Sequence, residues 1–412
     1  MLRVLRNPAY ATLFSAQVLA LLGTGLLTVA LGLLAYDLAG AAAGAVLGTA
    51  LTIKMVAYVG VAPPIAALVD RMPKKLVLVT ADVVRFAVAL TLPFVTEVWQ
   101  IYVLVFVLQS ASATFTPAFQ SLIPVVLPDA REYTRALSLS RLAYDLEALV
   151  SPTIAAALLT IVPFTTLFAG TAAGFAASAV LVLVTRLRAA PTAEQTLTFW
   201  QRLPLGVQVF ARTPTLRFLL WANVAVAAAT ALVLVDSVVY ARGLLGLDDA
   251  ALATTLAAYG LGSLAVAFAV PALVDRLGVV RTMSLGMLVL VAGLAAALPV
   301  TLVAETGTGW PALLATWVVL GVGTSLVNTP SARLLADAAT AQTRNLVYTA
   351  QFALSHACFL VTYPIAGWLG AVSLPVTVAA LGALAAVATA FALARARRLP
   401  ASASTGQDTV QR

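Results

Sequence analysis

The sequence ALVDRMPKK at Ala67–Lys75 decides the fold, because its first five residues return in ALVDRLGVVR at Ala272–Arg281. Each copy closes a long apolar stretch, and each is followed by further cations. The two copies lie about half the length of the chain apart. A pentapeptide that recurs at this interval in the same setting predicts that the chain consists of two related halves.

The composition is that of an integral membrane protein. Apolar residues make up 62% of the 412 residues, only 10% are charged, and the mean hydropathy is +1.01, whereas about 25% of residues are charged in soluble domains. Runs of about 20 apolar residues, enough to cross a bilayer, recur between short polar clusters. These runs are too long and too uniformly apolar for the strands of a β-barrel. We therefore expect an all-α membrane protein with twelve transmembrane helices, at 11–37, 44–69, 76–96, 99–122, 139–161, 164–186, 215–240, 250–274, 282–303, 310–330, 345–369 and 373–394.

Positive charges mark one side of this arrangement. Lys and Arg gather in the loops on the side of both termini, whereas the opposite loops carry Arg242 alone. Because loops rich in Lys and Arg stay in the cytoplasm, we expect a multi-pass protein of the bacterial inner (plasma) membrane with both termini cytoplasmic. This bias and the anionic lipids of the bilayer explain the net charge of +8, so no nucleic-acid partner is expected.

Matching landmarks divide the chain near its midpoint. Asn7-Pro8 opens the first span as Thr213-Pro214 opens the seventh. Six helices in each half give both halves the same direction through the membrane, so they form parallel repeats. The expected domains are an N-terminal six-helix bundle at 1–186, a cytoplasmic linker at 187–212, a C-terminal six-helix bundle at 213–398 and a disordered tail at 399–412.

The Asp-Arg pair followed by cations, between spans 2 and 3 and again between spans 8 and 9, resembles the signature loop of the major facilitator superfamily of transporters. The resemblance implies that Asp70, Arg71, Lys74, Asp275 and Arg276 form a conformational latch, which bridges helix ends until the two halves rock. An aspartate at a helix end can accept backbone hydrogen bonds, and an arginine can pair with a carboxylate. The alternative is that these residues only mark a charged membrane boundary.

A narrower resemblance points to the drug:proton antiporter branch that includes enterobactin and macrolide exporters. It rests on NPAYATLFSAQVLALLGTGLLTVALGLLAYDL at 7–38, SATFTPAFQSLIPVVLP at 112–128 and LSLSRLAYDLEALVSPTIAAAL at 137–158. Together with QFALSHACFLVTYPIAGWLG at 351–370, these blocks also resemble nickel-resistance exporters. Relatives in the drug branch often carry an acidic residue after the glycine of span 1, where this chain has Thr24.

The sequence has no GxxxxGK[ST] loop for ATP, so we expect no enzyme activity and no cofactor, and a gradient must drive transport. Ionisable groups inside the spans are the candidates, because a charge at the bilayer centre costs about 3 kcal/mol or more. Asp82 and Arg85 are spaced to pair in span 3, as are Arg141 and Asp145 in span 5. Glu147 points away from this arginine. We expect it to bind and release the coupling proton, and a salt bridge to another helix is the alternative.

Lys54 lies midway along span 2 with no acidic residue within a turn. It is expected to contact an anionic substrate, to bond a carboxylate such as Asp37 or Glu147, or to form a structural ion pair between helices. His356 and Cys358 are two residues apart on different faces of span 11, so they cannot chelate one ion together and no metal site is assigned. His356 is expected to be a hydrogen-bonded interior histidine, a titrating group or one ligand beside carboxylates of other helices.

Uncharged polar residues scattered through the spans are expected to line the central cavity: Gln17, Gln109, Asn223, Asn328 and Gln351, with Thr24, Thr28, Ser110, Thr230 and Tyr348 beside them. The sequence thus predicts a monomeric secondary transporter that exports small amphipathic molecules in exchange for protons, by alternating access around a midplane site. Export of a divalent metal and import or uniport of a metabolite are the alternatives. A non-transporting receptor or scaffold is the least favoured reading.

Overall fold

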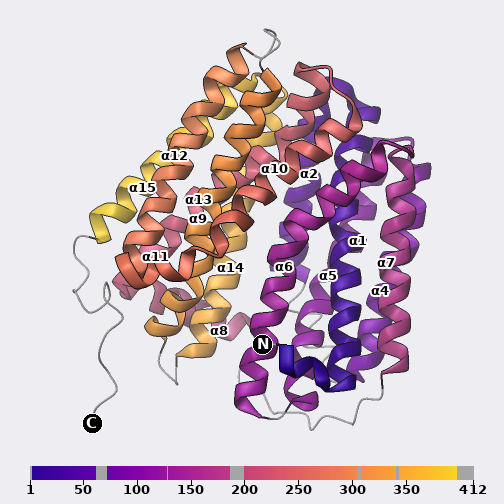
Figure 1. Cartoon of the computed structure of the whole chain (residues 1–412), viewed down its shortest axis with the longest axis vertical. Helices are drawn as coiled ribbons and strands as arrows, with labels where there is room; N and C mark the ends of the chain where they lie inside the picture. The colour runs from indigo at the N-terminus through magenta and orange to yellow at the C-terminus, as the bar shows by residue number, and fades with distance from the viewer. Residues whose placement is uncertain are drawn as a thin grey trace. The chain divides into compact units, whose positions relative to one another are not determined.

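The structure, a computed structural model, describes residues 2–61, 72–127, 129–185, 199–303, 309–339 and 343–396. Every regular element in these ranges is a helix, and no strand occurs among them (Figure 1). The all-α prediction is confirmed. The predicted tail at 399–412 and the linker residues 187–198 lie outside the described residues.

Ten helical stretches in the described ranges are long and apolar enough to cross a membrane. The first of them, Pro8–Gly60, contains the predicted span 11–37 and the start of the predicted span 44–69. The predicted span 139–161 falls in helix α6 (Ala130–Leu159), which is not among the ten. The class of multi-pass membrane protein is confirmed, whereas the count of twelve helices stays a prediction.

The chain divides into two compact units. Unit 1 comprises Met1–Thr196 and Asp248–Ala257, and unit 2 comprises Leu197–Leu247 and Ala258–Arg412. The domain boundaries drawn from the sequence remain predictions. The orientation of the termini in the membrane remains one as well.

Unit 1 is built around helix α1, which packs against α7, α6 and α2, while α4 packs against α7 and α5 (Figure 1). Its helices are α1 (Pro8–Ala39), α2 (Ala43–Val56), α4 (Lys74–Thr91), α5 (Val98–Val126), α6 (Ala130–Leu159) and α7 (Thr165–Val184). Short 3₁₀ turns stand at η1 (Leu2–Arg6), η2 (Gly40–Ala42) and η4 (Leu92–Phe94), and a π-helical turn, η3 (Ala57–Val61), continues α2.

The start of α1 shows how the sequence fixes a helix end. Oδ1 of Asn7 accepts hydrogen bonds from the backbone N–H groups of Ala9 and Tyr10, at 3.1 and 3.2 Å. Pro8 stands in the first turn, where a missing N–H costs nothing. The other end of the Asn7 amide donates to the carbonyl of Val126 at the end of α5. One residue therefore begins α1 and anchors it to its neighbour.

Unit 2 is built around helix α9, which packs against α15, α14, α13 and α12 (Figure 1). Its helices are α8 (Phe199–Arg212), α9 (Pro214–Val238), α10 (Asp249–Ala267), α11 (Val270–Leu277), α12 (Val279–Val303), α13 (Gly309–Ala338), α14 (Arg344–Pro364) and α15 (Leu374–Ala396); the first turns of α10, to Ala257, group with unit 1. Two π-helical turns, η5 (Val239–Leu244) and η7 (Ile365–Leu369), continue α9 and α14.

The predicted single span at 250–274 is divided in the structure. Helix α10 ends at Ala267, and α11 begins at Val270 with Pro271 in its first turn. Proline lacks a backbone N–H, and its ring clashes with the carbonyl four residues earlier. The prediction of one uninterrupted helix was therefore wrong at this position, although Pro271 was visible in the sequence.

The core of unit 2 is anchored by Trp317, the largest fully buried side chain among the described residues. Its indole Nε1 donates to Oγ of Ser237 at 2.7 Å. Its ring meets that of Tyr240 edge-to-face, with centroids 5.3 Å apart. The Tyr240 hydroxyl in turn bonds the hydroxyl of Thr301 in α12. Three helices are thereby joined by one cluster of aromatic and hydroxyl groups.

Replacing Trp317 with alanine should therefore destabilise unit 2. We expect Trp317→Ala to cost about 3–5 kcal/mol of unfolding free energy, since it leaves a cavity and removes the hydrogen bond that Oγ of Ser237 accepts. Thermal unfolding of the detergent-solubilised protein, followed by size-exclusion chromatography, measures the loss. The control is Trp99→Ala, because Trp99 is 61% exposed. Equal melting temperatures for the two variants would contradict the assignment.

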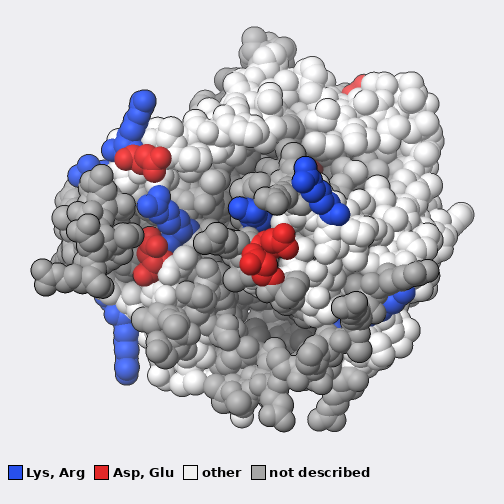
Figure 2. Space-filling view, turned by 60° about the horizontal axis from the view of Figure 1, so that its bottom comes forward, with Lys and Arg blue, Asp and Glu red and all other residues white. Residues whose placement is uncertain are grey.

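Charged side chains gather on the face that Figure 2 shows, turned so that the bottom of Figure 1 comes forward. Lys and Arg side chains stand there with a few Asp and Glu side chains among described residues of other types.

Candidate functional site

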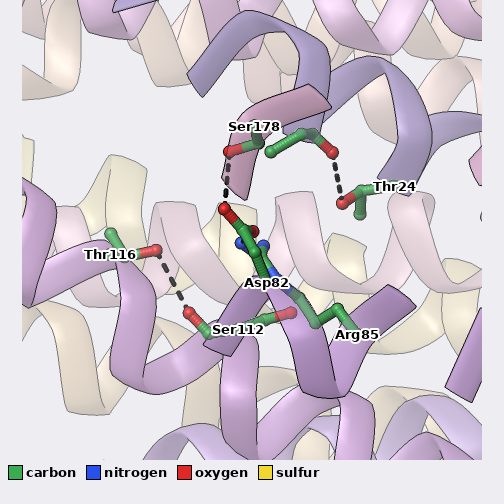
Figure 3. A network of polar contacts seen from close by, with 7 residues as sticks. Thr24, Asp82, Arg85, Ser112, Thr116 and Ser178 are labelled. Carbon is green, nitrogen blue, oxygen red and sulfur yellow. Dashed lines mark hydrogen bonds and ion pairs between the residues drawn. The ribbon is translucent and has the colours of Figure 1, made fainter. Parts of the chain in front are cut away.

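A buried ion pair lies at the centre of unit 1 (Figure 3). Asp82 and Arg85 of α4 are both buried, and Nη2 of Arg85 pairs with Oδ1 of Asp82. Oγ of Ser178 in α7 donates to the other carboxylate oxygen, Oδ2, at 2.7 Å. The spacing of three residues predicts this pairing on one helix face, whereas the contribution of Ser178 is visible only in the structure.

Two aromatic rings enclose the Arg85 guanidinium. The ring of Phe115 in α5 has its centroid 4.3 Å from the guanidinium carbon, and that of Phe175 in α7 lies 4.6 Å from it. Cation–π attraction replaces part of the hydration that the cation loses on burial. Both oxygens of the Asp82 carboxylate have partners. The arrangement fits an ion pair that holds α4, α5 and α7 together.

Breaking this pair should unfold unit 1 rather than tune its activity. We expect Asp82→Asn to cost about 3–5 kcal/mol of unfolding free energy, because Arg85 is left buried without its counter-charge. Asp82→Asn combined with Arg85→Gln should recover part of that loss. The control is Asp337→Asn at an exposed position of α13. Thermal unfolding in detergent measures the stability of all three variants. If Asp82→Asn alone is as stable as the parent protein, the structural role is disproved.

The carboxyl of Glu147 in α6 lies against helix α1. A side-chain carbon placed on Gly25 of α1 would come within 2.6 Å of Oε1 of Glu147 and would also collide with Ser151. Only glycine at residue 25 leaves room for the carboxyl there. Glu147 is partly buried, and the hydroxyl of Ser151, one turn further along α6, is buried without a hydrogen-bond partner among the described residues.

Lys54 of α2 interacts electrostatically with Glu147. The lysine is partly buried, and its Nζ lies 6.0 Å from the centre of the Tyr58 ring. Opposite charges attract more strongly where water is scarce. The structure thus brings Lys54 close to one of the two carboxylates named for it from the sequence. A cation and a carboxyl from two helices of unit 1 thus interact with each other.

Further polar residues of unit 1 link α1 to its neighbours. Gln17 is buried, and its Oε1 accepts a hydrogen bond from Oγ of Ser140 in α6 at 3.0 Å. The Thr24 hydroxyl bonds back to the carbonyl of Ala20. Gln109 of α5 is buried as well. The side chain of Asp145 is outside the described part of the chain, so its expected pairing with Arg141 stays a prediction.

Unit 2 holds a second set of polar contacts. The amides of Asn223 in α9 and Gln351 in α14 hydrogen-bond each other reciprocally, at 3.2 and 3.4 Å. The hydroxyl of Tyr259 in α10 lies 3.2 Å from that of Thr230 in α9 and donates to that of Thr324 in α13 at 3.1 Å. The structure therefore joins Asn223 to Gln351, both named from the sequence.

The Tyr259 contacts were not predicted from the sequence. Their only signal there was the scatter of hydroxyls in neighbouring spans.

His356 of α14 has its Nδ1 2.7 Å from the carbonyl of Phe352 and its ring 4.2 Å from the Phe352 ring. The histidine is half-buried and contacts its own helix, and its role stays a prediction. Asn328 is partly buried in α13, and its backbone carbonyl accepts from Ser331.

The predicted latch residues are only partly visible. Asp70 and Arg71 lie outside the described residues. In the second copy, Nη1 of Arg333 in α13 lies 3.9 Å from Oδ1 of Asp275 in α11, and both side chains are exposed. Arg276 is exposed beside them.

The cations of the first copy begin helix α4. Lys74 is its first residue. Nζ of its neighbour Lys75 donates to the carbonyl of Thr185, at the end of α7, at 3.0 Å. A cation at the carbonyl end of a helix also meets the negative end of its dipole. Each copy of the repeated Asp-Arg sequence therefore has a side chain that contacts a neighbouring helix. Lys75 makes this contact in the first copy, and Asp275 makes it with Arg333 in the second.

Sequence reasoning missed one buried acid altogether. Asp236 of α9 has no exposed surface, and it is the single acidic residue within the predicted span 215–240. That isolation in an apolar run was the available signal. Within the described residues, no group of three or more His, Cys, Asp or Glu side chains is placed to hold a metal ion.

A bundle of apolar helices that encloses ionisable groups is typical of polytopic membrane proteins that move ions or solutes. The model of the Major Facilitator Superfamily matches residues 13–270 and 238–411. The chain belongs to this superfamily. The resemblance drawn from the repeated Asp-Arg loops is confirmed at that level.

Relatives of known name match part of the chain. Macrolide efflux protein A of Streptococcus pyogenes is 24% identical over 183 residues, which cover 43% of this chain and 44% of that protein. Macrolide efflux protein A of Enterococcus faecalis is 26% identical over 135 residues, covering 32% of this chain and 42% of that protein. The match thus spans less than half the length of these relatives.

Solved structures of transporters share the fold over almost the whole chain. A POT family transporter in complex with 5-aminolevulinic acid superposes with a TM-score of 0.73 at 14% identity, over 94% of this chain and 96% of that one. A bacterial homologue of the human lysosomal transporter Spinster gives 0.73 at 12% identity, over 95% and 97%. The nucleoside transporter NupG gives 0.70 at 13%, over 94% and 99%. At these identities the likeness shows the fold alone.

Proposed function

We propose that this transporter exports small amphipathic molecules, with macrolide-like compounds as the first class to test, in exchange for protons. The partial similarity to two macrolide efflux proteins supports the substrate class. The proposed coupling group is Glu147, and the observation that carries this choice is its position between Gly25 and Lys54. Asp82 is unsuited to the role, since Arg85 and Ser178 already occupy both of its oxygens.

A proton and Lys54 compete for the Glu147 carboxylate in this proposal. When Glu147 is ionised, its negative charge attracts Lys54. When Glu147 binds a proton, that attraction is lost, because the carboxyl becomes neutral. The change also alters the contact of α6 with α1, because Oε1 of Glu147 sits where Gly25 leaves space. One proton thus changes two helix contacts of unit 1, which is the kind of event that shifts a two-state equilibrium.

Everted membrane vesicles of an expressing bacterium test the coupling. We expect vesicles with an acidic lumen to accumulate a radiolabelled macrolide, and Glu147→Gln to lower that uptake to the level of vesicles without the protein. The glutamine keeps the size of the side chain but cannot release a proton. Uptake is measured across a series of imposed pH gradients, with equal amounts of protein in each membrane.

The matched control for this variant is Glu132→Gln, the same chemical change in the first turn of α6. It should leave uptake unchanged. Equal uptake by Glu147→Gln and the parent protein at every gradient would refute the coupling assignment. Macrolide accumulation driven by the opposite gradient would refute export and favour an importer instead.

We also propose that the exposed Asp275–Arg333 pair acts as a conformational latch. Exposed ion pairs contribute about 0–1 kcal/mol to stability, so Asp275→Asn should leave the melting temperature nearly unchanged. The same variant should slow macrolide uptake if the pair forms and breaks during each cycle. The charge swap Asp275→Arg with Arg333→Asp should restore the rate, whereas Asp337→Asn should have no effect. Full macrolide uptake by Asp275→Asn would indicate that the pair only marks a charged membrane boundary.

A further inference from the structure

Asp236 is a carboxyl without any partner in the described part of the chain. The residue is fully buried in α9, and neither Oδ1 nor Oδ2 accepts a hydrogen bond. Asp82, the fully buried acid of unit 1, has partners on both oxygens. An ionised carboxylate buried without a partner is so unfavourable that such a group takes up a proton instead. The closed packing around Asp236 therefore accommodates the neutral acid.

The carboxyl of Asp236 is covered by the turn between α14 and α15. A methyl group placed on Gly370, the residue that follows η7, would lie 2.7 Å from Oδ1 of Asp236 and 3.9 Å from the Thr377 hydroxyl of α15. Gly370 therefore lies directly against the acid. Thr377 offers no proton to it, because its hydroxyl donates to the carbonyl of Ser373.

Two π-helical turns flank the acid. η5 begins at Val239, three residues after Asp236, and η7 ends at Leu369, the residue before Gly370. π-Helical turns hold one extra residue per hydrogen-bonded turn and occur frequently at functional sites. A π-helical turn therefore stands at each of the two helix ends around Asp236.

No cation near Asp236 compensates its charge among the described residues. The Tyr240 hydroxyl in η5, four residues further along, bonds the Thr301 hydroxyl and not the acid. Arg242, also in η5, donates to the carbonyl of Leu247. Other cations on the helices packed against α9 stand elsewhere: Arg395 lies over Trp221 and Phe391, Arg333 faces Asp275, and Arg217 and Arg281 are in the first turns of α9 and α12.

The remaining ionisable groups described on these helices make no hydrogen bond or ion pair with Asp236 either. They are Arg212 of α8, Asp337 of α13, and Tyr348, His356, Cys358 and Tyr363 of α14. The indole of Trp317 is taken by Ser237. The acid thus has neither a donor nor a counter-ion in this packing.

We propose that Asp236 is a proton-binding site of unit 2, which holds its proton while Gly370 and η7 cover the carboxyl. When this cover moves away and water enters, the O–H bond breaks, the electron pair stays on the carboxylate, and the proton passes to water. The carboxylate must take up a proton from water again before Gly370 and η7 return to cover it. The site is separate from Glu147 and does not depend on the proposed exchange of protons for macrolides.

Infrared spectroscopy of the protein in lipid vesicles tests the site directly. A protonated carboxylic acid has a C=O stretching band that shifts on exchange from H₂O to D₂O. We expect this band near neutral pH in the parent protein, its loss in Asp236→Asn, and its retention in Glu147→Gln. Asparagine keeps the volume and the neutrality of the protonated acid, so this variant should fold.

Two further measurements keep the test decisive. Labelling the aspartate carboxyls with ¹³C should shift the same band in the unaltered protein, without any mutation. Gly370→Ala should shift the band, since its methyl group displaces the acid, whereas Gly382→Ala should not, because the nearest atom there is 3.8 Å away. A ¹³C-aspartate-sensitive band that survives Asp236→Asn, or no such band in the parent protein, would overturn the proposal. A band unmoved by Gly370→Ala would overturn the role of the cover.

Discussion

Each charge or polar group inside a bilayer must find its partner within the protein, because lipid tails offer none. Three of the described acids, Asp82, Glu147 and Asp236, meet that constraint in three ways. Asp82 is held by Arg85 and Ser178 on both oxygens. Glu147 attracts Lys54 across helices. Asp236 has neither a donor nor a cation among the described residues. The number of partners separates the structural pair of Asp82 from the two acids for which we propose proton exchange.

The same constraint explains how much was predictable. Span positions and the Asp82–Arg85 pair depend on local spacing, so the sequence predicts them. Ser178, the partner of Asp82, and Lys75, which bonds the end of α7, act between helices far apart in the chain. A sequence without an alignment has no signal for such contacts. Asp236 was overlooked for a different reason. Its defining feature is that it has no partner, and this shows only when the neighbouring residues are placed around it.

Close helix approach sets where these groups can lie. Glycine at residue 25 lets the Glu147 carboxyl rest against α1, and glycine at residue 370 lets the last turn before α15 rest on Asp236. A single methyl group at either position would push an acid out of its place. Both acids are therefore tied to helix contacts that change if a helix rotates or shifts. This links the protonation of a side chain to the movement of a backbone, as a gradient-driven transporter requires.

Helix α8 is joined to the body of unit 2 rather than suspended between the units. It packs along α14, where the absence of a side chain on Gly206 brings it against the carbonyl of Leu346, and its Phe210 is buried. If the protein were expressed as two separate pieces, residues 199–212 would have to stay with the second piece. A spacer inserted to lengthen the connection would have to stand before Phe199.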